Sequence, residues 1–508
     1  MKKLNRIVFL AGLAAWLGAA LVVQGQNLEE KVTVRKLKNG LTVIFAERHE
    51  VPTFSAIYGF KVGAVDEVPG ITGLAHLFEH MAFKGTPLIG TSDFEQEKVL
   101  LEEANRVGRD LSLELLKGDG ASQETIKELK ERLAKADKQQ KQYIVKDEID
   151  RIYKEAGGVG LNASTGKDQT QYYISLPANR FELFCLVESE RTKNAVLREF
   201  YTERSVVQEE RKQTTEAVPA RMLSESFLGA AFVAHPYQHP VIGWASDIHS
   251  VTLEEAIAFK RKYYTPNNCV MAIVGDIYPE KAMPLVEKYF DDCTPGEEPP
   301  VVRTVEPKQI GERRVRYEAD AEPQLMIGFH KPCFPNRDDV VLMVTASVLT
   351  SGRSSILYKD LVKDRQLAVD INASSSVPGD RYNNLFVISG TPRFPHTNDE
   401  LEKAVMEHLE ALKEKLVSEK ELQKVKNKVE ASYIRSMESN MGLAMTLMRV
   451  QLIRDDWKLL LKMKEMVNAV TAEDIRECAR KYFVLENATF AQLIKRGQKA
   501  GERNAEVE

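Results

Sequence analysis

The feature of this chain that most constrains its fold is an internal repeat. The segment VTLEEAIAFKRKYYTPNN, residues 251–268, matches VTAEDIRECARKYFVLEN, residues 470–487, at a constant offset of 219 residues. Each copy begins with a Thr followed by acidic residues, which suits the start of a helix, and each leads through a polar turn into an apolar strand. The offset is close to half of the 508-residue chain. The sequence therefore predicts two homologous halves.

A linker between the halves is predicted where the composition changes. Residues 294–307, TPGEEPPVVRTVEP, are rich in Pro and Glu, which is typical of a segment without periodic structure. We therefore expect a first half at residues 26–300 and a second half at residues 301–508. Apolar segments such as 41–48 (LTVIFAER) and 324–330 (QLMIGFH) predict strands in both halves. The expected fold class is α+β, with an antiparallel sheet flanked by helices in each half.

One charged segment stands apart in the first half. Residues 102–156 consist mostly of Glu, Lys, Arg, Asp, Leu and Ala, with a break at GDGAS, residues 118–122. Two charged amphipathic helices joined by a glycine turn are the simplest interpretation. We expect a helical hairpin inserted into the first half, with its charges on a solvated face and not at a binding site.

The first residues are typical of an export signal. Three basic residues precede an apolar run at residues 7–23, and a small-residue exit follows at Gly25. We expect residues 1–25 to be a signal peptide, with a retained N-terminal anchor as the alternative because the apolar run is long. The rest of the sequence contains no run that predicts a membrane span. The protein is therefore expected in the periplasm or outside the cell.

The charge balance argues against nucleic acid as a partner. The chain carries 70 Lys and Arg against 74 Asp and Glu, a formal net charge of −4. Binding to a phosphate backbone requires a basic excess, which this composition does not supply.

Residues 71–86, ITGLAHLFEHMAFKGT, carry the sharpest chemical signal in the sequence. Thr72 suits a helix start and Gly85 a helix end, so a helix is expected between them. His76 and His80 lie one turn apart and face the same way, so both imidazoles can bind one metal ion. The spacing is that of the H-x-x-E-H inverzincins. The alternative is a pair of core histidines on a buried helix.

Glu79 lies beside the two histidines, three residues after His76. A carboxylate at this position is suited to take a proton from a metal-bound water. A catalytic zinc site uses three protein ligands and leaves the fourth position to water. A third ligand must therefore come from elsewhere in the chain.

Candidates for the third ligand lie in FYTERSVVQEERKQ, residues 200–213. On a helix, Glu203 and Glu210 fall on the same stripe, together with two valines. Carboxylates that face inward need partners, and a cation held by the histidines would satisfy one of them. Spacing does not choose between these two glutamates, and it leaves Glu188 and Glu190 open. The alternative for this segment is a salt-bridged surface helix.

These motifs together resemble the insulinase or pitrilysin family of zinc metallopeptidases, which includes the mitochondrial processing peptidase subunits and bacterial periplasmic relatives. The resemblance covers nearly the whole chain after the export signal. It rests on motifs in a specific order: GLAHLFEHMAFKGT (73–86), GLNASTGKDQTQYYISLP (160–177), ERSVVQEE (203–210), HPYQHPVIG (235–243) and YYTPNN (263–268) leading to IVGD.

The resemblance implies a zinc-dependent endopeptidase that hydrolyses peptides or small unfolded proteins. Glu210 is then the third zinc ligand after His76 and His80, and Glu203 is a supporting carboxylate. Glu79 is the general base on a zinc-bound water, with one Zn²⁺ per chain. The long gap between His80 and Glu210 is explained by the charged helical insertion.

The resemblance also implies a substrate-binding strand at Asn162, Ala163 and Ser164, next to the zinc. An exposed strand edge can pair with an extended peptide backbone with little preference for side chains. The alternative for these three residues is an N-glycosylation sequon, which strand residues directly after it make less suitable. The two histidines of HPYQHP are interpreted as turn structure and not as a second metal site.

The sequence departs from the family at two positions in the second half. Self-sufficient members carry an Arg and, seven residues later, a Tyr that bind the substrate carbonyl, and this chain has Val362 and Val369 there. Neither side chain donates a hydrogen bond. We therefore expect a heteromer in which a related subunit without H-x-x-E-H supplies the Arg and Tyr, with a homodimer as the other arrangement. The competing function is a non-catalytic scaffold or peptide-binding member of the family.

Overall fold

A computed structural model describes residues 28–496 of the chain. The predicted signal peptide, residues 1–25, lies outside the described residues. Among the helices of residues 28–496, none combines the length and the apolar character that crossing a membrane requires.

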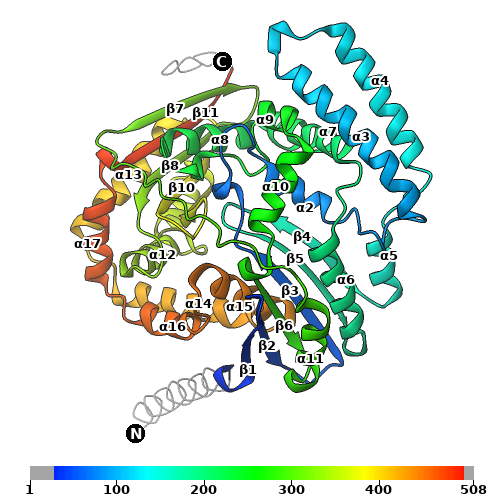
Figure 1. Ribbon diagram of the computed structural model, residues 1–508. Coiled ribbons are helices and arrows are strands. Elements are labelled where there is room, and N and C mark those ends of the chain that lie inside the picture. Colours follow the sequence, from blue (N-terminus) through cyan, green and yellow to red (C-terminus); the bar gives the residue numbers. More distant parts are fainter. Residues whose placement is uncertain (1–27, 497–508) are drawn as a thin grey trace.

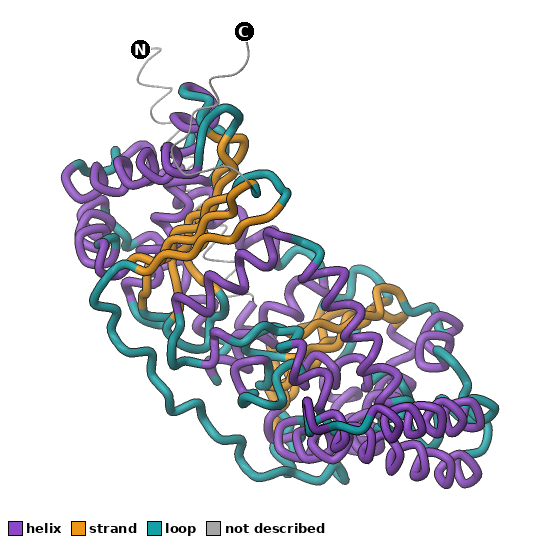
Figure 2. The backbone as a smooth tube through the Cα atoms, turned by 90° about the horizontal axis from the view of Figure 1, so that it is seen from above, coloured by secondary structure: helices purple, strands orange, loops and turns teal. Residues whose placement is uncertain are grey.

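Two β-sheets form the centres of the two halves, as Figure 2 shows in orange. The first has the order β1-β2-β6-β3-β5-β4 and the second the order β7-β11-β8-β10-β9. The strands of the first sheet are β1 (Val32–Lys36), β2 (Thr42–Glu47), β3 (Thr53–Phe60), β4 (Val159–Thr165), β5 (Thr170–Pro177) and β6 (Cys269–Gly275). Those of the second are β7 (Arg313–Ala319), β8 (Gln324–Lys331), β9 (Ala368–Val377), β10 (Asn384–Pro392) and β11 (Ala488–Lys495).

Helices pack around both sheets. In the first half they are α2 (Leu74–Met81), α3 (Phe94–Leu115), α4 (Gln123–Gln140), α5 (Glu148–Glu155), α6 (Phe181–Asn194), α7 (Phe200–Arg211), α8 (Pro219–Ala231), α9 (Ala245–Ser250), α10 (Leu253–Tyr263) and α11 (Pro279–Phe290). In the second half they are α12 (Arg337–Thr350), α13 (Asn398–Glu414), α14 (Glu419–Ser436), α15 (Asn440–Arg454), α16 (Leu459–Asn468) and α17 (Ala472–Tyr482).

The predicted α+β fold of two homologous halves is confirmed. Helix α10 and helix α17 begin 219 residues apart, and both carry a capping box, Thr252 with Glu255 and Thr471 with Asp474. Strands β6 and β11, which follow these helices, begin at the same offset. Each sheet is antiparallel except for one pair, β2 with β6 and β7 with β11. The parallel pairs arise because β6 and β11 each return to their sheet through a helix and not through a hairpin.

Each half lends one helix to the other. Helix α8 of the first half packs on β7 and β11 of the second sheet, whereas α15 of the second half packs on β3 and β6 of the first (Figure 1). Leu447 and Met448 of α15 are fully buried against Ile57 of β3 and Ala272 of β6. The predicted linker, residues 294–307, forms neither helix nor strand. The exchange of helices joins the halves through two apolar interfaces in addition to this linker.

The charged segment folds as a helical hairpin that extends from the first half, at the upper right of Figure 1. Helix α3 begins at Phe94, eight residues before the predicted start, because Asp93 caps it by accepting a hydrogen bond from the Gln96 backbone N–H. The turn at Gly118–Gly120 lies where the glycines predicted it, and α4 follows. A short third helix, α5, then returns the chain to the sheet.

Candidate metal centre

Helix α2 carries the H-x-x-E-H motif on the surface of the first sheet. It is shorter than predicted, since it begins at Leu74 and ends at Met81. Gly73 precedes it with a φ of 87°, a conformation that favours glycine. The Thr72 hydroxyl does not cap the helix, because it donates to Asp247 and accepts from the Trp244 backbone N–H.

Two buried side chains of opposite charge hold the ends of α2. The Glu67 carboxylate accepts hydrogen bonds from the backbone N–H groups of Gly73 at 2.8 Å and Ala75 at 2.7 Å. At the other end, the Arg191 Nε donates to the Ala82 carbonyl at 2.9 Å. An anion at the N-terminus and a cation at the C-terminus both match the helix dipole. Sequence reasoning missed both residues, because Glu67 lies outside the helix and Arg191 is far away in the chain.

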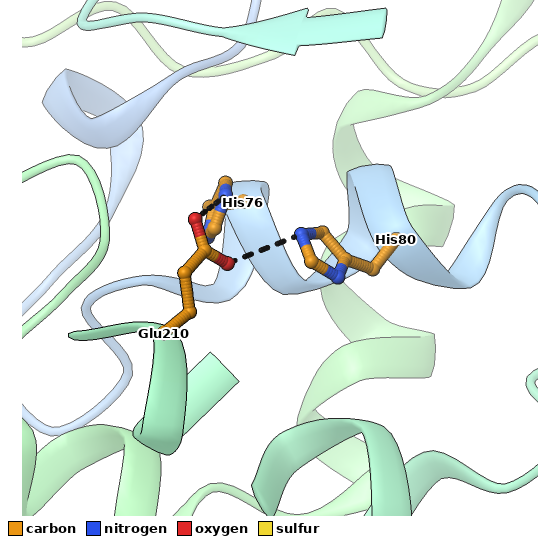
Figure 3. Close-up of side chains that lie close together, drawn as sticks. All are labelled: His76, His80 and Glu210. Carbon is orange, nitrogen blue, oxygen red and sulfur yellow. Dashed lines mark ion pairs between the residues drawn. The ribbon is translucent and has the colours of Figure 1, made fainter. Parts of the chain in front are cut away.

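His76, His80 and Glu210 converge on one point between α2 and α7, as Figure 3 shows. The His76 Nε2 lies 3.8 Å from one Glu210 carboxylate oxygen, and the His80 Nε2 lies 3.5 Å from the other. One ligand atom from each residue lies within 4.8 Å of the other two. Donors bound to a common Zn²⁺ at about 2 Å are separated by about 3 to 4 Å. Two imidazoles and a carboxylate at these separations fit a zinc ion.

Glu203 supports this group from the same stripe of α7. Its carboxylate accepts a hydrogen bond from the His80 Nδ1 at 3.0 Å and binds the Lys84 ammonium at 2.6 Å. Burial opposes the charge on Glu203, but the hydrogen bonds from His80 and Lys84 outweigh it and lower the pKa of Glu203 to about 2. The bond from Nδ1 leaves the Nε2 of His80 free to bind a metal.

The other two glutamates that the sequence left open lie elsewhere. Glu188 is buried between the hydroxyls of Tyr58 and Tyr153 and forms an ion pair with Arg191 at 2.8 Å. Glu190 accepts a hydrogen bond from the Asn194 amide. Neither belongs to the group of three ligands, so the geometry favours Glu210 as the third member.

The charge states of the two histidines differ. Burial, and then the neighbouring His80, lowers the pKa of His76 to about 4, so its imidazole is neutral at physiological pH. For His80, burial lowers the pKa but the bond to Glu203 and the nearby carboxylates raise it above the ordinary value. The buried Nδ1 of His76 has no hydrogen-bond partner among residues 28–496. Neutral imidazoles are the form that binds Zn²⁺.

Glu79 lies beside the three ligands and bridges α2 to strand β4. It accepts a hydrogen bond from the Thr165 hydroxyl at 2.5 Å. Burial raises the pKa of Glu79 above its ordinary value, partly offset by this bond and by the charge of His80. A carboxylate with a raised pKa is better matched to proton transfer near neutral pH.

Strand β4, which contains Asn162, Ala163 and Ser164, is the outermost strand of the first sheet. It pairs with β5 on one side, and an irregularity in the register lies between Val159 and Asn162. The Ala163 side chain is buried, whereas Asn162 and Ser164 are exposed. Since Thr165 of this strand contacts Glu79, the edge strand and the group of ligands are adjacent.

The helical hairpin packs against the back of α7. Arg204 donates to the Ser112 hydroxyl at 2.7 Å, and Thr202 donates to Asp137 at 2.8 Å. Gly108 lies against the Tyr201 ring, where an added Cβ would be 2.1 Å from a ring carbon. The hairpin therefore supports the helix that carries Glu203 and Glu210, in addition to presenting charges to solvent.

The two histidines of the HPYQHP motif lie in a turn. The His235 Nδ1 accepts a hydrogen bond from the Tyr237 backbone N–H at 3.2 Å, as the interpretation as turn structure expects. Among residues 28–496, the three residues His76, His80 and Glu210 are the one group of His, Cys, Asp and Glu side chains close enough to share a metal.

Comparisons with known proteins give consistent results. Residues 250–429 match the family model described as "Peptidase M16 inactive domain". The chain is 29% identical over 479 residues to "Zinc protease PqqE" of Helicobacter pylori, with 93% of this chain and 94% of the relative covered.

Solved structures agree with this match. "The crystal structure of a protease from Helicobacter pylori" aligns with a TM-score of 0.76 at 26% identity, covering 91% of this chain and 99% of that one. "The crystal structure of the periplasmic protease PqqL from Escherichia coli" aligns with a TM-score of 0.66 at 16% identity, covering 92% of this chain and 48% of that one.

Proposed function

This chain belongs to the M16 family of insulinase-like zinc-protease homologues, and from that premise we propose that it is a zinc-dependent endopeptidase whose working site lies in the first half. The observation that carries the proposal is the meeting of His76, His80 and Glu210 from two helices, with Glu79 beside them. We propose one Zn²⁺ per chain at these three residues. A bound Zn²⁺ would polarise a peptide carbonyl and acidify water beside it.

The residues of the chain have distinct roles in this proposal. Glu79 takes the proton from the attacking water and passes it to the leaving amine. Glu203 holds the His80 ring through Nδ1 and keeps it oriented. Strand β4 pairs with the backbone of an extended peptide or unfolded segment along Asn162, Ala163 and Ser164, so that the scissile bond lies near Glu79.

The decisive variant is Glu79→Gln, which keeps the shape of the side chain but removes the base. Hydrolysis of a peptide mixture should fall by about 10²- to 10⁴-fold, the usual contribution of a positioned base. Zinc content should stay the same, because Glu79 is not one of the three ligands. Glu209→Gln is a matched control, since Glu209 is exposed on α7 and binds Gln213 and Lys212. Activity in Glu79→Gln equal to that of the control would contradict the enzyme and favour the non-catalytic scaffold or peptide-binding role.

A partner subunit is part of the proposal because the second half lacks donors for the substrate carbonyl. The Val362 side chain is 8% exposed and packs in the core of the second half, and Val369 is 53% exposed on β9. Neither offers a hydrogen-bond donor. We propose a heteromer in which a related subunit supplies the missing Arg and Tyr.

The partner proposal is tested with purified components. A missing oxyanion donor costs about 10²- to 10³-fold in rate, so the chain with its partner should exceed the chain alone by at least that factor. Equal rates for the single chain and the mixture would exclude the heteromer. They would leave the single chain or a homodimer as the active form.

We also propose a periplasmic or secreted location, which the name of the periplasmic relative PqqL supports. The test is fractionation of cells that express the full chain, followed by N-terminal sequencing of the purified protein. Recovery in the periplasm or medium with a new N-terminus near residue 26 would support an export signal that is removed. Recovery in the cytoplasm with an intact N-terminus would contradict it.

A further inference from the structure

A turn of the second half contacts the first half close to the N-terminus of α2. This turn, residues 378–383, connects β9 to β10. Within it, the Arg381 guanidinium binds both oxygens of Asp66, at 2.9 and 3.0 Å. The Arg381 side chain is 9% exposed and that of Asp66 is 1% exposed. The contact is thus a buried ion pair between the halves.

Asp66 is covalently next to the residue that caps α2. Its neighbour Glu67 accepts the hydrogen bonds from Gly73 and Ala75 that hold the first turn of the helix. Asp66 is itself fixed in place, because its carboxylate accepts from the Gly63 N–H and its carbonyl accepts from the Tyr263 hydroxyl. A shift of Asp66 therefore carries Glu67 with it.

The backbone of the same turn is also anchored to the first half. The Asp168 carboxylate accepts from the backbone N–H groups of Asp380 at 2.6 Å and Arg381 at 3.1 Å. The Tyr237 hydroxyl donates to the other oxygen of Asp168. At Gly379 an added Cβ would be 2.5 Å from Asp168, so this approach needs a glycine. Asp168 lies in the loop between β4 and β5, and therefore the turn also contacts the base of the proposed substrate strand.

We propose that Arg381 is a positioning residue, which couples the placement of α2 and its His76, Glu79 and His80 to the docking of the second half through Asp66 and Glu67. The proposal rests on the function proposed above for the α2 site. It gives the second half a role in forming the metal centre, although none of its residues is a proposed ligand. Removing one partner of a buried ion pair leaves the other charge without compensation, which is strongly destabilising at that point.

Amide hydrogen exchange tests the proposal without relying on activity. In metal-free Arg381→Gln, the peptide covering residues 68–82 should exchange at least about 10-fold faster than in wild type, since its protection depends on the Glu67 cap. Arg381→Lys should restore part of the protection, because it retains the charge. Asp455→Asn is the control, since it removes the ion pair of Asp455 with Lys61, which also joins the halves but does not contact α2.

The double variant Asp66→Asn/Arg381→Gln completes a mutant cycle. It should lose no more protection of residues 68–82 than Arg381→Gln alone, because a neutral pair leaves no buried charge unpaired. Additive losses in the double variant would overturn the coupling, and so would unchanged exchange in Arg381→Gln or an equal effect of Asp455→Asn. If Arg381→Gln fails to fold, Arg381→Lys and the double variant give the same decision.

Enzyme kinetics then separate this inference from the proposed function. With the zinc-loaded chain and its partner, kcat of Arg381→Gln should fall by about 10-fold or more while KM changes less than about 2-fold, because misplacement affects the reacting groups. A wild-type protein without activity would contradict the proposed function, and the exchange data would still decide the role of Arg381. A change in KM alone would assign Arg381 to substrate binding and overturn the positioning role.

Discussion

The two halves share one fold but differ along one helical stripe. Glu203 and Glu210 of α7 correspond, at the offset of 219 residues, to Leu422 and Val429 of α14. Leu422 is 1% exposed in the core of the second half, and Val429 packs against that core. Helix α12, which follows β8 as α2 follows β3, contains neither His nor Glu. The comparison teaches that two carboxylates on an amphipathic stripe suffice to turn a core-forming helix into one side of a candidate metal centre.

The second half places a cavity where the first half places its ligands. This cavity of about 400 Å³ lies between α12, α14 and α16 and is lined by Met343, Val429 and Met463 among others. Thioether and aliphatic side chains in these positions do not hold Zn²⁺, which prefers imidazole, thiolate and carboxylate. We therefore expect metal binding in the first half only, and four changes can break or sharpen this contrast.

The largest effect is expected from Glu210→Val, which installs the residue of the second half in the first. Zinc binding of about 10 to 16 kcal/mol shared among the ligands implies a loss of about 10²- to 10³-fold in affinity. A competition titration with a chelating dye measures it. Glu209→Gln one residue away should bind zinc as wild type does, and equal affinities for both variants would remove Glu210 from the site.

A smaller loss is expected from Glu203→Leu, the other exchange along the stripe. Removing a group that orients a metal-binding histidine costs about 10- to 100-fold in metal affinity. The same titration applies, with Leu422→Met in the second half as the control, since a volume-conserving core change should leave zinc binding intact. Undiminished affinity in Glu203→Leu would show that the bond to the His80 Nδ1 does not orient the ring.

The hairpin gives a third test, because it supports α7 and has no counterpart at α14. Gly108→Ala should lower the free energy of unfolding by about 1 to 3 kcal/mol, since its Cβ overlaps the Tyr201 ring. Denaturant unfolding measures this change. Gly120→Ala lies in the turn of the hairpin with no atom within 4 Å and should change stability little. A neutral Gly108→Ala would mean that the hairpin is only loosely seated on α7.

The smallest effect concerns the pH dependence of the metal-free protein. The pKa of His76 is about 4 when folded and about 6.5 when unfolded. Protonation therefore favours the unfolded chain, and the stability from neutral His76 is present above about pH 6.5 and lost as the pH falls towards 4. Relative to His76→Gln, wild type should lose about 1 kcal/mol between about pH 7.5 and 5.5. Parallel stability curves for the two proteins would contradict the buried, neutral imidazole.

The sequence was sufficient for elements with a local signal. The repeat at 251–268 and 470–487 predicted two halves, and the i, i+7 spacing of Glu203 and Glu210 predicted that both face one way. The structure brings both to α2. Spacing did not choose between the two glutamates, because the choice depends on which side chain reaches the Nε2 atoms across a tertiary contact.

Long-range contacts could not be predicted in this way. Thr72 has the local signature of an N-cap, but the buried Glu67 performs that role. The apolar faces of α8 and α15 indicate that both are covered, yet periodicity does not say that each covers the sheet of the other half. Arg381 is one of many arginines in the sequence, and only the folded chain pairs it with Asp66.

The most direct test of a metal centre built from α2 and α7 is zinc X-ray absorption on the purified chain, together with elemental analysis. The account predicts one Zn²⁺ per chain, coordinated by two imidazoles and oxygen with no sulfur, and loss of the zinc in Glu210→Val. Sulfur in the coordination shell, or full zinc occupancy in Glu210→Val, would contradict it.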